Sequence, residues 1–266
     1  MNEDLKSLAE EAALVGGRLL LTGQPSARQV DAKSSPTDVV TQMDTASEQA
    51  IVAHLMAARP DDAVLGEEAG ERPGTSGMRW VIDPLDGTVN YLYGLPLWAV
   101  SVAVEGPSGA LAGAVAVPAL GQLFSAAQGG GAWLTADGRL RRLAVRECDN
   151  PASALVATGF GYLPQRRKEQ AESLAQVLDQ VRDIRRCGAA ALDLCWLAAG
   201  QYDAYFERGL QPWDSAAGTL IAREAGAVVT GATTHEPDTE FLLGAAPGVH
   251  AQLRDLLVAA GAHTGA

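Results

Sequence analysis

Trp80-Val81-Ile82-Asp83-Pro84-Leu85-Asp86-Gly87-Thr88 is the most informative segment of this 266-residue chain. Its first three residues are apolar and predict a buried strand, which we expect to end at Pro84 because proline cannot donate to a central ladder. Asp83 and Asp86 would then project from a turn at the edge of a rigid sheet. Gly87 permits a close approach of the backbone to a ligand, and Thr88 begins a short helical stretch whose N–H groups can point at an anion. Two carboxylates beside such N–H groups favour a divalent cation that bridges to a phosphate.

Short apolar runs separated by Gly, Pro and Asp surround this segment and predict further strands. These strands are expected near residues 64–65, 98–104, 111–117 and 123–126, with a hairpin at Asp137-Gly138 between 132–134 and 140–145. Many strands joined by tight turns predict an antiparallel sheet. Two amphipathic helices should precede it, over residues 5–21 and 45–59, with Asp44 or Thr45 as the cap of the second.

After Cys148 the pattern changes to strands that alternate with helices. Helices are predicted at 165–181, 190–199, 215–225 and 249–260, and strands at 154–156, 184–187, 202–206, 228–229 and 241–243. The chain is therefore expected to form two sheet-and-helix lobes, an N-terminal α+β lobe over residues 1–146 and a C-terminal α/β lobe over residues 147–266.

Composition narrows the possible functions. The net charge of −12 disfavours nucleic-acid binding, because an acidic surface repels phosphate backbones. The first residues are acidic rather than basic, so no signal peptide is predicted. No apolar run reaches the roughly 18 residues of a membrane span. Three cysteines without a CxxC pair indicate reduced thiols and a cytoplasmic protein.

Two more acidic segments, Gly66-Glu67-Glu68 and Trp213-Asp214-Ser215, stand where a strand ends or a helix begins. Taken singly, the first is typical of a solvated loop and the second of a helix N-cap. No histidine lies near them and no HExxH or CxxC is present, so these segments lack the nitrogen and sulfur ligands that zinc prefers. Carboxylate, carbonyl and water oxygens suit Mg²⁺. Two such ions roughly 3.5–4 Å apart can activate a water and neutralise a leaving oxygen.

Together these segments resemble the inositol monophosphatase family, within the larger group that includes fructose-1,6-bisphosphatases. The similarity covers nearly the whole chain in order, including residues 33–38, 66–68, 80–91 and 213–218 and the stretch Glu224-Ala225-Gly226-Ala227. The resemblance implies a layered αβαβα fold and a Mg²⁺-dependent phosphatase with two or three ions per site. Such an enzyme hydrolyses a small phosphorylated polyol, here inositol monophosphate, to inositol and phosphate by metal-activated water. A homodimer and inhibition by Li⁺ are also implied.

The resemblance also implies roles for individual residues. Glu67 and Asp83 would hold one Mg²⁺ with the carbonyl of Leu85, while Asp83, Asp86 and Asp214 would hold a second, and a looser third ion would use Glu67. The N–H groups of Gly87 and Thr88 would bind the phosphate. Thr88 and Asp44 would orient the attacking water, and Glu67 would favour its deprotonation. Glu68 would support the ligands from behind, and Lys33 would lie on a loop that moves over the site.

The polyol would meet Asp86, Gly188-Ala189-Ala190 and Glu207 by the same resemblance. Many relatives carry Ser or Thr where Ala189 stands, so one hydroxyl that can touch the polyol is missing here. This departure leaves other phosphatases of the same fold open, acting on histidinol phosphate, fructose 1,6-bisphosphate or 3′-phosphoadenosine 5′-phosphate. A non-catalytic regulatory protein of this fold is the alternative from another class.

Direct hydrolysis without a phosphoenzyme is the expected mechanism. The spacing Asp83-x-x-Asp86 differs from the DxDxT of phosphatases that use an aspartate nucleophile. The sequence also has no Gly-x-Ser-x-Gly and no P-loop, which argues against an esterase and a nucleoside triphosphatase.

Overall fold

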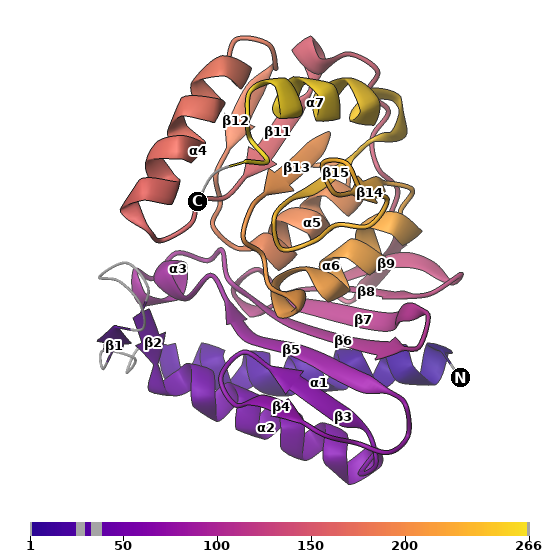
Figure 1. Cartoon of the computed structure of the whole chain (residues 1–266). Coiled ribbons are helices and arrows are strands. Elements are labelled where there is room, and N and C mark those ends of the chain that lie inside the picture. The colour runs from indigo at the N-terminus through magenta and orange to yellow at the C-terminus, as the bar shows by residue number, and fades with distance from the viewer. Residues whose placement is uncertain (1, 25–29, 33–38, 265–266) are drawn as a thin grey trace.

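The computed structural model describes residues 2–24, 30–32 and 39–264, with only the backbone of residues 30–32 and 39–41. Five layers are stacked in it (Figure 1). Helices α1 and α2 cover one face of a large sheet, α5 and α6 lie between that sheet and a smaller one, and α4 and α7 cover the far face of the smaller sheet. The predicted αβαβα sandwich is confirmed.

The first half contains α1 (Asn2–Gly23), β1 (Val30–Ala32), β2 (Val39–Thr41), α2 (Gln42–Ala58), β3 (Ala63–Gly66), β4 (Gly70–Arg72), β5 (Arg79–Asp86), α3 (Thr88–Leu92), β6 (Ala99–Gly106), β7 (Gly109–Val117), β8 (Gln122–Ala127), β9 (Gly131–Ala136) and β10 (Arg139–Arg142). The second half contains β11 (Leu155–Thr158), α4 (Pro164–Val177), β12 (Asp183–Arg185), α5 (Ala190–Ala198), β13 (Ala204–Glu207), α6 (Pro212–Glu224), β14 (Val228–Thr230), β15 (Leu242–Ala245) and α7 (Pro247–Ala259).

The large sheet has the strand order β10-β9-β8-β7-β6-β5-β3-β4. Its neighbouring strands are antiparallel, as predicted, except that β3 runs parallel to β5. The small sheet has the order β12-β11-β13-β15-β14, in which the first three strands are parallel and the last pairs are antiparallel. The parallel strands follow from the crossover helices that the alternating pattern predicted.

Strand β5 does not end at Pro84, so that expectation is wrong. Asp83 pairs with Ser101 and Asp86 with Ala99, so the ladder gains one residue on β5 between the two aspartates. Such a bulge accommodates a proline inside a central strand, because the residues in it are not held to the regular ladder. The two aspartates therefore project from an irregular strand end rather than from a turn beyond it.

Alternation along β5 builds the cores on both faces of the large sheet. Trp80 and Ile82 are fully buried against α1 and α2, whereas Val81 faces the layer of α5 and α6. The second core combines strand residues such as Phe124 with helix residues such as Ile221. Because this core joins both halves of the chain, the lobe boundary near residues 146–147 stays a prediction.

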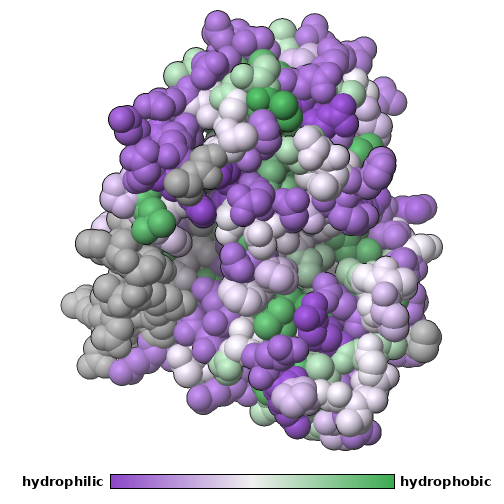
Figure 2. Space-filling view, viewed as in Figure 1, coloured by the Kyte–Doolittle hydropathy of each residue, from purple (hydrophilic) through white to green (hydrophobic). Residues whose placement is uncertain are grey.

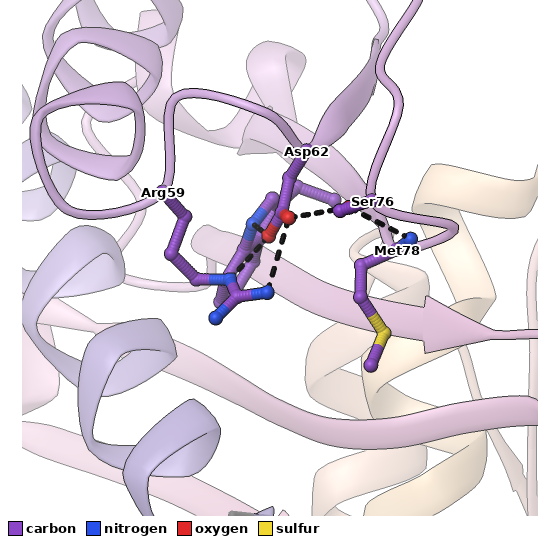
Figure 3. A network of polar contacts seen from close by, with 5 residues as sticks. Arg59, Asp62, Ser76 and Met78 are labelled. Carbon is purple, nitrogen blue, oxygen red and sulfur yellow. Dashed lines mark hydrogen bonds and ion pairs between the residues drawn. The ribbon is translucent and has the colours of Figure 1, made fainter.

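A buried carboxylate fixes the loop that leads from α2 into β3 and β5 (Figure 3). Asp62 accepts hydrogen bonds from the indole N–H of Trp80 at 2.9 Å and from the Ser76 hydroxyl at 2.6 Å, and it pairs with Arg59. Burial raises the pKa of Asp62, but the hydrogen bonds from Arg59, Ser76 and Trp80 more than offset this and lower it. The network fixes the start of β5 and hence the approach to the aspartates.

Several helix ends differ from the prediction. Helix α2 begins at Gln42 and α6 at Pro212, so Asp44 and Asp214 each lie third in their helix rather than at the cap. Helix α4 ends at Val177, four residues early. Strand β4 had no predicted counterpart, because its three residues are all exposed and lack an apolar pattern.

No helix in the described ranges is long and apolar enough to cross a membrane. The face of the molecule in Figure 2 is largely hydrophilic, with scattered apolar residues.

Candidate active site

The predicted carboxylates meet at the end of the large sheet where it faces α5 and α6. Asp83 is buried, and its pKa is raised well above the usual value by that burial and then by the charges of Glu67, Asp86, Asp214 and Asp44. The structure thus brings five acidic residues from four separate segments into one electrostatic group.

Burial, and after it the crowding of like charges, makes this group of carboxylates costly to ionise. Burial, with hydrogen bonds from the Ala191 and Ala190 N–H groups opposing it, raises the pKa of Asp86 to about 7. Burial likewise raises the pKa of Asp214 to about 8, although the Gln211 N–H opposes that shift. A divalent cation among these side chains would relieve the repulsion, since a nearby opposite charge favours the ionised form.

The donors fit Mg²⁺ in their chemistry, because they are carboxylate oxygens without thiolate or imidazole. They do not form a ready cage: within residues 2–24, 30–32 and 39–264, no three His, Cys, Asp or Glu side chains are arranged to hold a metal ion. Backbone N–H groups hold the carboxylates: Leu85 N donates to Asp83 at 3.0 Å, Ala191 N to Asp86 at 2.8 Å and Gln211 N to Asp214 at 2.6 Å. A carboxylate offers about four lone-pair sites, so each keeps acceptor capacity for a cation.

Helix α2 supports two of the acidic segments from behind. The carboxylate of Glu48, which is buried, accepts from the N–H groups of Glu68 at 2.9 Å and Ala69 at 2.8 Å. The Ser47 hydroxyl donates to the carbonyl of Pro84 at 3.1 Å. These contacts position the turn that carries Glu67 and the bulge in β5.

The segment after β5 turns sharply into α3. Gly87 adopts the left-handed conformation with φ of 87°, and a Cβ there would lie 2.9 Å from the carbonyl oxygen of Leu97. Glycine is therefore required both by the conformation and by the space. The Thr88 hydroxyl donates to the carbonyl of Leu85 at 3.1 Å, which brings the predicted carbonyl ligand next to a residue that is predicted to orient the water.

The predicted substrate residues, except the buried Ala189, line a pocket of about 290 Å³ beside the carboxylates. Asp86, Gly188, Ala190, Glu207 and Asp214 line it. The Tyr205 hydroxyl donates to Glu207 at 2.6 Å, and burial, partly offset by that hydrogen bond, raises the pKa of Glu207 to about 7. Ala189 is the N-cap of α5, and its side chain makes no capping hydrogen bond.

A larger pocket of about 610 Å³ lies beside Thr219 and Arg223 of α6, and none of the residues predicted for the site lines it.

Known proteins resemble this chain throughout. The model of the inositol monophosphatase family matches residues 1–263. The chain belongs to this family. An inositol-1-monophosphatase of Mycobacterium leprae is 47% identical over 227 residues, which are 83% of this chain and 78% of that protein. The Nus factor SuhB of Vibrio cholerae is 36% identical over 259 residues, 94% of each chain.

Solved structures of the family agree with the fold. Mycobacterium tuberculosis SuhB superposes with a TM-score of 0.85 and 39% identity, with 98% of both chains covered. The Thermotoga maritima IMPase gives a TM-score of 0.85 at 26% identity and covers 99% of this chain and 98% of that one. The family supports a phosphatase that acts on a phosphorylated substrate.

Some residues around the candidate site carry little or no signal in the sequence. Glu48 carries only a helix-capping signal, because it stands three residues after Thr45, and Asp193 of α5 carries no local signal because it lies in an apolar helix. Asp193 is buried, and desolvation followed by the charges of Glu207 and Asp86 raises its pKa well above the usual value. Arg166, Arg186 and Arg208 also line the pocket beside the carboxylates, although Arg166 stands in a basic run that is typical of a solvated helix start. Lys33 lies outside the described residues.

Proposed function

We propose that this chain is a Mg²⁺-dependent phosphatase that hydrolyses inositol monophosphate to inositol and phosphate. The observation that carries the proposal is that the buried Asp83 lies in the electric field of four other carboxylates beside a pocket of about 290 Å³. A phosphate could not approach such a cluster unless cations neutralised it. The family membership supplies the reaction class.

Glu67, Asp83 and the Leu85 carbonyl would hold one Mg²⁺, and Asp83, Asp86 and Asp214 a second. Bound Mg²⁺ would supply charge neutralisation and polarisation of the phosphoryl oxygens. The Gly87 and Thr88 N–H groups would donate hydrogen bonds to the phosphate, and Glu68 would hold the metal ligands in place from behind.

The protein's own part is to orient a water and the polyol. Because the Thr88 hydroxyl donates its proton to Leu85, it can only accept from a water, and Asp44 would accept from the same water. Both contacts would leave a lone pair of that water directed at phosphorus. On attack, the water proton that Asp44 accepts would pass to that carboxylate, and Glu67 would favour this deprotonation. On the other side, the Glu207 carboxylate held by Tyr205 would accept from a ring hydroxyl.

The proposal is tested by phosphate release from inositol 1-phosphate, histidinol phosphate, fructose 1,6-bisphosphate, 3′-phosphoadenosine 5′-phosphate and glycerol 2-phosphate, with Mg²⁺ and with chelator. We expect Mg²⁺-dependent release that is fastest with inositol 1-phosphate. If another of the five substrates were hydrolysed fastest, the proposed reaction class would stand and the proposed substrate would change. Glu207→Gln should then alter the ranking of substrates more than it alters Mg²⁺ affinity.

Metal assignment is tested separately with Asp86→Asn and Asp214→Asn. Each removes one ligand charge, so turnover should fall by orders of magnitude while the circular dichroism spectrum is unchanged. Turnover near that of the unaltered protein in either variant would refute the assignment.

A regulatory role is a second candidate, because relatives such as that of Vibrio cholerae are named Nus factor. Folded protein that binds Mg²⁺ and releases phosphate from none of the five substrates would favour it. The homodimer remains a proposal that sedimentation analysis can test.

A further inference from the structure

The Asp86 carboxylate makes its described contacts with a segment more than a hundred residues away. Its Oδ1 accepts from Ala190 N at 3.0 Å and its Oδ2 from Ala191 N at 2.8 Å. Both N–H groups belong to the first turn of α5, so each oxygen is held by a separate donor. The plane and the direction of the carboxylate are thereby fixed from the opposite half of the chain.

The first turn of α5 differs from those of the helices around it. Helices α4, α6 and α7 begin with Pro164, Pro212 and Pro247, and proline at this position gives up an N–H that has no partner within the helix. Helix α5 begins with Ala190 instead, and that N–H donates to Asp86. Its N-cap, Ala189, brings no side-chain acceptor that would compete for these donors.

Further contacts clamp the same two segments together. The Asn90 side-chain amide donates to the Cys187 carbonyl at 2.8 Å and to the Leu97 carbonyl at 2.6 Å. A Cβ on Gly87 would lie 3.2 Å from the Cβ of Ala189, which shows how closely the backbones approach. The position of α5 relative to β5 is therefore specified by several contacts on both sides of the aspartate.

We propose that the N–H groups of Ala190 and Ala191 are positioning groups that aim Asp86 at the second metal ion. The inference rests on the proposed function, in which Asp86 is a ligand. The hydrogen bonds from Ala190 and Ala191, with a further one from the Leu192 N–H, use three of the roughly four lone-pair sites of the carboxylate and leave one for a cation. Fixing the carboxylate before the ion arrives lowers the entropy lost on binding. A helix N-terminus also favours the ionised carboxylate.

Ala190→Pro is the direct test. Proline is well tolerated at the first helical position. Ala189, with φ of −147° and ψ of 101°, is extended rather than helical, and residues before proline are extended too. The substitution removes one donor, and its ring carbon occupies the space beside Oδ1. Ala190→Gly is the matched control, because it weakens the helix but keeps the N–H.

Mg²⁺ affinity by isothermal titration calorimetry is the main measurement, with melting temperature and circular dichroism in chelator as checks of the fold. We expect Mg²⁺ to bind about tenfold more weakly to Ala190→Pro, and Ala190→Gly to bind like the unaltered protein despite a melting temperature lowered by about 2 °C. In phosphate release, Ala190→Pro should need more Mg²⁺ for half-maximal rate.

Unchanged Mg²⁺ affinity in folded Ala190→Pro would overturn the inference and leave the proposed function intact. If Ala190→Pro does not fold, an ester in place of the Ala191 amide removes a donor without adding bulk, and unchanged affinity there would also overturn it. Failure of the unaltered protein to bind Mg²⁺, or equal affinity in Asp86→Asn, would instead refute the metal assignment and remove the basis of the inference.

Discussion

Replacing Glu48 by glutamine should weaken both the fold and the metal site. The Glu48 carboxylate is 2% exposed and accepts from the N–H groups of Glu68 at 2.9 Å and Ala69 at 2.8 Å. Glutamine keeps the shape but offers one carbonyl oxygen, so one N–H would face an NH₂ group. An unsatisfied buried N–H costs about 1–3 kcal/mol, and the loss of charge weakens the second bond by about 1 kcal/mol. We therefore expect a loss of about 3 kcal/mol in the free energy of unfolding.

Urea unfolding in the presence of chelator measures this loss without a contribution from Mg²⁺. Glu71→Gln is the control, because Glu71 lies on the neighbouring strand β4 and is exposed; it should change stability by less than about 0.5 kcal/mol. Since Glu48 holds the turn that carries Glu67, Mg²⁺ affinity should fall as well. A Glu48→Gln protein as stable as Glu71→Gln, with unchanged Mg²⁺ affinity, would refute the reasoning.

Three further predictions concern pH, backbone and loop. In the folded protein the pKa of Asp86 is raised to about 7 and that of Asp214 to about 8, against an ordinary 3.8, so the native state binds their protons more tightly than the unfolded state does. Without metal, the free energy of unfolding should therefore fall as pH rises from about 4 to 8. Mg²⁺ should raise the melting temperature more at pH 8 than at pH 5. Gly87→Ala should destabilise by more than Gly94→Ala, because both have positive φ but only Gly87 lacks space for a Cβ; equal unfolding midpoints in urea would contradict this. Asp62→Ala should cost about 3 kcal/mol in thermal unfolding by leaving Trp80 Nε1 and Arg59 without their acceptor, whereas the exposed neighbour variant Asp61→Ala should cost less than about 1 kcal/mol.

Local pattern was sufficient for the order of most elements. The apolar run Trp80-Val81-Ile82 predicted the buried strand that is β5, and the change of pattern after Cys148 predicted the strands and helices of the small sheet. The sequence pattern did not predict β4, because that strand is too short and too exposed to carry an apolar period. It also predicted that β5 ends at Pro84, because a proline inside a central strand was not expected without a bulge. It also misplaced helix starts, because Asp44 and Asp214 are good caps yet lie inside the first turns.

The types of residue in the candidate site were equally visible, since carboxylates after strands, without histidine or paired cysteine, indicate an oxygen site for Mg²⁺. Their mutual arrangement was not visible. Asp86 is held by α5, the Glu67 turn by Glu48, and the site shares its pocket with Arg166, Arg186 and Arg208. These contacts join residues far apart in the chain, and they exist because α5 and α6 pack between the two sheets. Sequence spacing reports the periodicity of one element, whereas the meeting of two elements depends on how their buried faces pack.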